Sequence, residues 1–296
     1  MRLRSLLYAL TVSASTLAFL GGGVSATPFQ PVMDEFWIVR NGGEIFRDSF
    51  NDGILPPSGP DGAATYFSAA QSGLAGMTSE TGGKLTITPA LGAQTLITGN
   101  FADTFTGGTR ADITGGNSLS ITNSVEIHGR FDLSSLPTIT GQQFGIRFND
   151  RTASNTGDDI IQLSVAKSSV SGNIGVRLAE LDFVADTVEL ADFISIQSLL
   201  PSASQIELVL TKAANSNIVE ASYILRDAFN VVVGGGALDN INNVTGDPLT
   251  IYNPEGYTRA QFFATDTGVP LPEPGVLALF AAGLAGLCCA RRKHKG

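Results

Sequence analysis

His128 heads the short set of side chains in this sequence that could carry out acid–base chemistry. It alternates with Glu126 and Arg130, and the other histidine of the chain is His294, near the end. A histidine beside a carboxylate can act as a general base. Alternation at period two also places the three side chains on one face of a strand, where charges pair across neighbouring strands. We therefore interpret His128 as part of a solvated strand face and not as a catalytic base.

Paired carboxylates occur at Glu180 and Asp182, which share a strand face at period two, with Asp186 four residues further on. A two-carboxylate mechanism needs one acid of raised pKa at a fixed distance from the other. Nothing in the surrounding residues indicates this arrangement, and there is no serine-nucleophile motif. The two cysteines are Cys288 and Cys289, so the preceding domain has no thiol chemistry and no disulfide. The sequence predicts a protein that is not an enzyme.

Hard oxygen donors gather near both ends of the central domain, with Asp48 and Asp52 at its start and Asp266 at its end. Calcium takes six to eight oxygen ligands of this kind. If the first and last strands pair, these ends come together. We therefore predict a possible structural calcium site at Asp48, Asp52 and Asp266, against the plainer interpretation that they are turn residues. No other cofactor is expected.

Exposed tryptophan or tyrosine rings are the usual stacking platforms for sugars, and the sequence offers few. Trp37 is the only tryptophan and follows Phe36, while most other aromatic residues are phenylalanines expected in the core. Tyr252 and Tyr257 near the last expected strand could be exposed. The aromatic residues alone therefore do not predict a glycan-binding site.

The first 26 residues have the three parts of a secretory signal peptide. Arg2 and Arg4 are followed by an apolar stretch over 6–20 and by small residues that end at Ala26. We predict cleavage after Ala26 and export by the secretion translocon and signal peptidase.

The last residues combine Pro272-Glu273-Pro274, an apolar run over 276–290 and a basic end over 291–295. The two prolines keep the motif extended. As a helix, residues 275–290 would be about 24 Å long, short for a hydrocarbon core of about 30 Å. The basic end should stay in the cytoplasm. In this order the three features resemble the PEP-CTERM sorting tail of exported bacterial proteins.

The PEP-CTERM resemblance implies processing by an exosortase-like enzyme, with an inner-membrane intermediate that later reaches the cell surface or the extracellular space. Two alternatives remain open. The tail could be an ordinary membrane anchor. Residues 271–275, Leu-Pro-Glu-Pro-Gly, also resemble a sortase signal, although Pro274 stands where that signal has threonine.

Net charge is clearer once both ends are set aside. The chain has 18 basic and 27 acidic side chains. Six of the basic ones lie in the end segments, so residues 27–274 keep 12 basic and 27 acidic side chains, a net charge of −15. Such a charge repels nucleic acid and anionic lipid, and we expect no nucleic-acid partner.

The central domain, residues 27–265, has the composition and the period-two alternation of an all-β protein. Val125–Phe131, Phe144–Phe148 and Ile161–Val165 alternate in this way, as do Ile206–Leu210, Ile218–Leu225 and Tyr257–Ala264. We predict a two-sheet antiparallel sandwich (a jelly roll), with a signal helix before it and a short transmembrane helix after a linker over 266–271.

The start of the domain resembles concanavalin A-like (laminin-G-like) jelly rolls, through residues 45–53 and the Gly83-Lys84-Leu85-Thr86-Ile87 strand. Some of these proteins are glucanases with three spaced acids on one strand. The string over 180–186 departs from that spacing, and its last acid is Asp186 instead of glutamate. The leading prediction is thus an exported, non-enzymatic surface or extracellular-matrix protein that contributes to exopolysaccharide or biofilm material. The alternative is a secreted jelly roll that binds or cleaves carbohydrate.

Overall fold

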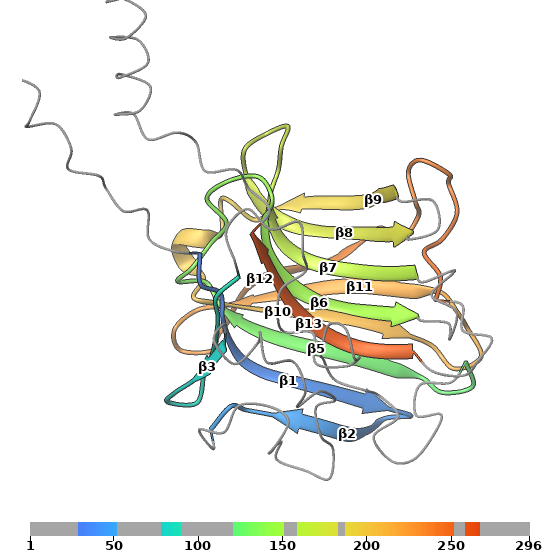
Figure 1. Ribbon diagram of the computed structural model, residues 1–296, viewed down its shortest axis with the longest axis horizontal. Helices are drawn as coiled ribbons and strands as arrows, with labels where there is room; N and C mark the ends of the chain where they lie inside the picture. The colour runs from blue at the N-terminus through green and yellow to red at the C-terminus, as the bar shows by residue number, and fades with distance from the viewer. Residues whose placement is uncertain are drawn as a thin grey trace, which may run out of the picture. The chain divides into compact units, whose positions relative to one another are not determined.

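A computed structural model describes residues 29–51, 78–89, 121–150, 159–182, 187–251 and 258–266. All of them belong to one compact unit, Pro28–Gly268. Its described elements are strands and a single 3₁₀ turn, η1 (Leu200–Ser202). The predicted all-β, two-sheet antiparallel sandwich is confirmed (Figure 1).

One sheet has eight strands, in the order β12-β11-β10-β5-β1-β4-β3, with β2 also paired to β1. Its strands are β1 (Val32–Arg40), β2 (Gly43–Asp48), β3 (Thr78–Glu80), β4 (Leu85–Ile87), β5 (Val125–Asp132), β10 (Gln205–Lys212), β11 (Val219–Arg226) and β12 (Val232–Leu238).

The other sheet has five strands, in the order β13-β6-β7-β8-β9. They are β6 (Gln142–Asp150), β7 (Asp159–Lys167), β8 (Ile174–Asp182), β9 (Thr187–Ser195) and β13 (Thr258–Asp266). Figure 1 shows β6 to β9 side by side, with β13 in red next to β6. Every pairing in both sheets is antiparallel.

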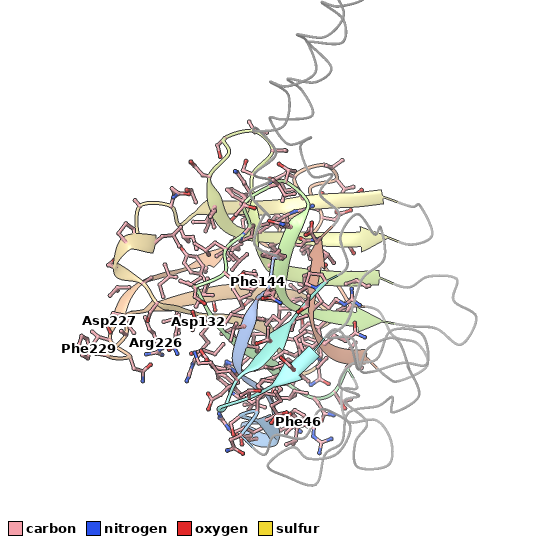
Figure 2. The ribbon with its side chains drawn as sticks, turned by 60° about the vertical axis from the view of Figure 1, so that its left-hand side comes forward. Phe46, Asp132, Phe144, Arg226, Asp227 and Phe229 are labelled. Carbon is pink, nitrogen blue, oxygen red and sulfur yellow. The ribbon has the colours of Figure 1, made fainter. Side chains whose placement is uncertain are left out.

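Phenylalanine rings fill the space between the two sheets. Phe36 of β1 meets Phe262 of β13 with 5.1 Å between ring centroids, and Phe131 of β5 meets Phe144 of β6 at 4.9 Å. Figure 2 shows Phe144 in the middle of the sandwich. All four rings are fully buried, as expected when alternate residues of both sheets face one core.

The helices predicted at the two ends of the chain lie outside the described residues. Ala26, the Pro272-Glu273-Pro274 motif and the apolar run over 276–290 are all in these parts. Among the residues that the structure describes, no helix has the length and apolar character needed to cross a membrane.

Candidate ligand-binding site

The outer face of the eight-stranded sheet is organised around Trp37. The ring of His128 stacks on it with 4.5 Å between centroids and 9° between planes. The guanidinium groups of Arg47 and Arg130 lie 4.8 and 5.5 Å from the same ring. With only 8% of its surface exposed, Trp37 is not a platform on which a sugar could stack.

Carboxylates complete this cluster. His128 Nε2 lies 3.2 Å from Glu126 and Nδ1 lies 3.3 Å from Glu207. Glu207 is also 3.6 Å from both Arg130 and Arg226. Burial opposes the charged form of Glu207, but the hydrogen bond with His128 and the nearby positive charges outweigh it and lower the pKa of this carboxyl. His128 therefore takes part in the cross-strand charge pairing predicted for it.

The outer face of the five-stranded sheet has a different chemistry. Its side chains alternate with the core residues, and we call the following set the polar face: Gln143, Arg147, Gln162, Ser164, Arg177, Gln261 and Thr265. Among the described side chains of this face there is no carboxylate. Two phenylalanines, Phe193 on β9 and Phe263 on β13, lie on the same face.

Strand register places the polar face in rows. One row runs from Gln261 through Arg147 to Gln162, and the next runs from Phe263 through Gly145 and Ser164 to Arg177 and Phe193. These side chains come from five strands of the sheet, so the sheet itself fixes their spacing.

Hydrogen bonds hold this layer in one arrangement. Arg147 donates from Nε to Gln261 Oε1 at 2.6 Å, and its guanidinium lies 5.6 Å from the Phe263 ring. Gln143 Oε1 accepts from Gln162 Nε2 at 3.0 Å and from the Ser164 hydroxyl at 3.2 Å. The amide orientations of the glutamines follow from these contacts.

In three glutamine and threonine side chains of this layer, one buried polar atom has no hydrogen-bond partner among the described residues. These atoms are Gln162 Oε1, Gln261 Nε2 and Thr265 Oγ1, on side chains that are at most 3% exposed. A buried polar atom without a partner costs about 1–3 kcal/mol. The described strands supply no hydrogen-bond partner for these three atoms, which lie beneath the surface of the face.

Part of the polar face is accessible. Gln143, Arg177 and Phe193 are half-buried, whereas Arg147 and Gln261 are buried. Burial lowers the pKa of the Arg177 guanidinium. The accessible side chains thus place an amide on β6, a guanidinium on β8 and an aromatic ring on β9 of one sheet face.

A second polar feature lies at the end of β10, where the ammonium of Lys212 is buried among backbone carbonyls. It donates to the carbonyl oxygens of Asn123, Ala213, Ser216 and Ile121 at 2.7, 3.1, 3.1 and 3.2 Å. Burial lowers the pKa of Lys212. This arrangement ties the chain before β5 to the β10–β11 turn and has no accessible ligand atom, so we interpret it as structural.

The predicted calcium ligands are only partly described. Asp48 ends β2, is buried and accepts from the backbone N–H of Phe50 at 2.8 Å. Asp266 is the last residue of β13, not part of a linker, and accepts from Gln142 Nε2 at 3.1 Å. Asp52 lies outside the described residues.

The pairing of first and last strands, on which the calcium prediction depended, is wrong, because β13 pairs with β6 and β1 belongs to the other sheet. Among the described residues, no three His, Cys, Asp or Glu side chains form a group suited to a metal. The calcium site stays a prediction.

The paired carboxylates Glu180 and Asp182 lie on β8, two residues apart. Opposite Glu180 on β9 is Glu189, and on β7 it is Ile161. Asp186, Tyr252 and Tyr257 lie outside the described residues. The sequence analysis placed Glu180 and Asp182 on a strand face but did not extend that strand back to Arg177, and it did not recognise β9, which carries Phe193. Alternation of Arg177 with Val176 and Leu178 was the available signal.

No protein-family model matches the chain, and no curated protein matches it. Among solved structures, the chain is similar to the "CBM2 module of Lactobacillus casei BL23 phage J-1 evolved Dit". The identity is 13%, over 79% of this chain and 90% of that chain. With a TM-score of 0.28, this likeness carries no weight for fold or function.

Proposed function

We propose that this protein is exported and acts outside the cell as a non-enzymatic surface or matrix protein that binds polysaccharide. The observation that carries the proposal is the polar face of the five-stranded sheet, where Gln143, Arg177 and Phe193 are accessible above a hydrogen-bonded polar layer. Saccharide hydroxyls donate and accept hydrogen bonds, so a sugar chain matches an accessible amide and guanidinium that lie on one sheet face with an aromatic ring.

The contrast between the two outer faces supports this choice. On the eight-stranded sheet, Glu207, His128 and Arg130 satisfy one another within the protein. On the five-stranded sheet, Gln143, Arg177 and Phe193 are accessible, and no described carboxylate neutralises the guanidinium. A few convergent polar groups beside apolar surface are typical of sites for small molecules and sugars.

Export and sorting are part of the same proposal. The segment ending at Ala26 and the Pro272-Glu273-Pro274 tail support secretion, an inner-membrane intermediate and release by an exosortase-like enzyme. Both lie at the ends of the chain, so Pro28–Gly268 would be the form that meets extracellular polymers.

Affinity electrophoresis of Pro28–Gly268 through gels containing single polysaccharides tests the binding function. All described strands and the whole described core lie in this unit, so it can fold without the end segments. For any polysaccharide that slows the migration of the wild-type protein, we expect Phe193→Ala and Gln143→Ala to weaken the affinity about tenfold or more.

Phe229→Ala is the matched control for Phe193→Ala. Phe229 is 87% exposed in the turn between β11 and β12 of the other sheet, and Figure 2 shows it far from the core. This variant should bind as the wild type does. Absence of retardation by every polysaccharide, or loss of binding in Phe229→Ala but not in Phe193→Ala, would refute the proposal.

A further inference from the structure

Arg177 differs from the other described cationic side chains. Within the described part of the chain, it has no hydrogen bond and no ion pair. Every other described arginine or lysine side chain interacts with a partner, namely Arg40, Arg47, Lys84, Arg130, Arg147, Lys167, Lys212 and Arg226.

The position of Arg177 makes this difference significant. It is half-buried on β8, directly opposite Ser164 on β7 and Phe193 on β9. A half-buried charge is costly unless it is paired. The chain has 27 acidic side chains, yet none of the described side chains on this face is a carboxylate.

A guanidinium group matches an oxyanion through two parallel N–H donors, and such bidentate, charge-assisted bonds are about twice as strong as neutral ones. The geometry points to an acidic polysaccharide as the ligand, with a uronate carboxylate bound by Arg177. This inference rests on the proposed polysaccharide binding and specifies its substrate class.

The accessible side chains on the same face as Arg177 fit other parts of an acidic polysaccharide chain. Phe193 offers an aromatic surface on one side, and its ring lies so close to Gly175 that a Cβ there would clash with it. The Gln143 amide nitrogen is not used in its contacts with Gln162 and Ser164. Carboxylate, sugar ring and hydroxyl thus each find a matching group.

The net charge of residues 27–274 is −15, so an acidic polymer is repelled at long range and must be held by a local contact. Salt screens the long-range repulsion, with a Debye length of about 8 Å at 0.15 M, more than it screens a half-buried pair. We therefore expect binding to persist, and not to vanish, at moderate ionic strength.

Polygalacturonate and its fully methyl-esterified form are the probes, because they share a backbone and differ in carboxylate charge. Binding of Pro28–Gly268 to both, and to neutral dextran, is measured by affinity electrophoresis. We expect polygalacturonate to bind roughly ten- to hundredfold more tightly than its ester, the range of one charged hydrogen-bonded pair.

Arg177→Gln should remove this preference for the charged polymer. Arg177→Lys keeps the positive charge but loses the two parallel N–H donors, so it should retain only part of the preference. Arg226→Gln is the charge-matched control on the other sheet and should keep the full preference. Melting curves verify that each variant is folded.

Equal binding of the charged and esterified polymers would overturn the inference and leave the proposed function intact. A preference that survives Arg177→Gln would also overturn it. Binding of neither polymer nor of any other polysaccharide would refute the proposed function itself, so the two failures are distinguishable.

Discussion

Lys212 ties the chain before β5 to the β10–β11 turn through a single ammonium group. It is 4% exposed and donates to four backbone carbonyls. Lys212→Met keeps much of the volume but leaves these carbonyls without a donor. Because each orphaned buried group costs about 1–3 kcal/mol, we expect the free energy of unfolding to fall by more than about 2 kcal/mol in urea titrations.

Lys167→Met is the control for this variant, because Lys167 is exposed and donates to the single carbonyl of Thr138. It should change the free energy of unfolding by less than about 0.5 kcal/mol. If both variants unfold at the same urea concentration as the wild type, Lys212 does not hold these segments together.

Glu207 makes the stability of the fold depend on pH. Its pKa in the folded protein lies below the ordinary 4.5 despite burial, mainly because of His128. A carboxyl with a depressed folded pKa stabilises the fold above its unfolded pKa, and this contribution is lost as the pH falls through the folded pKa. Melting temperatures measured from about pH 7 to pH 3 should therefore fall less steeply below about pH 4.5 in Glu207→Gln.

Glu220→Gln serves as the reference for this titration, since Glu220 is exposed on β11. Its acid transition should follow that of the wild type. An identical slope for Glu207→Gln and the wild type would show that the network around His128 contributes nothing to acid stability.

At the level of strands, Gly145 sets how closely β6 and β7 approach. A Cβ at this position would collide with the Leu163 carbonyl and with Ser164 Cα, both on β7. Gly145→Ala must push the two strands apart, and overpacking of this kind costs about 1–3 kcal/mol. Thermal unfolding should detect this loss.

Gly43→Ala is the matched substitution, because a Cβ there meets only the Arg40 carbonyl at an ordinary 3.6 Å. We expect its melting temperature to stay close to that of the wild type. A Gly145→Ala protein as stable as Gly43→Ala would mean that the β6–β7 spacing is not limited at Gly145.

Alternation in the sequence predicted the strands in which one face is apolar and the other polar. β5, β6, β7, β10, β11 and β13 were predicted in this way, and β6 pairs with β7 and β10 with β11 as antiparallel neighbours. β1 was missed because a register shift between Met33 and Glu35 interrupts its alternation. β12 was missed because it contains Gly234-Gly235-Gly236, and glycine is depleted in strands.

The candidate site was harder to predict than the fold, because its contacts join residues far apart in the sequence. Arg147 and Gln261 are separated by 114 residues and His128 and Glu207 by 79. Alternation identifies an outward-facing Gln143 or Arg147, as the sequence did. It does not indicate that β13 lies beside β6, and this pairing is what assembles the polar face.

For the molecule as a whole, the tail prediction concerns processing. Pro272-Glu273-Pro274 is an extended element placed before a short apolar run, which an export-coupled protease could recognise. We expect Glu273→Ala to accumulate as an unprocessed membrane form, detected by fractionation and mass spectrometry.

Substitution of Glu255 with alanine, outside the tail, provides the comparison and should leave processing unchanged. Intact residues 276–296 on the wild-type surface form would instead indicate an ordinary membrane anchor.

The central claim is that this protein binds polysaccharide without cleaving it. An active site needs convergent ionisable groups with displaced pKa values, whereas His128 and its neighbours pair with one another. Co-sedimentation of Pro28–Gly268 with insoluble polygalacturonate, with reducing ends counted in the same samples, tests binding and cleavage together. We predict that the protein sediments with the polymer while reducing ends stay at the buffer level. A steady rise in reducing ends, abolished by Glu180→Gln and Asp182→Asn, or a protein that stays in the supernatant, would contradict this account.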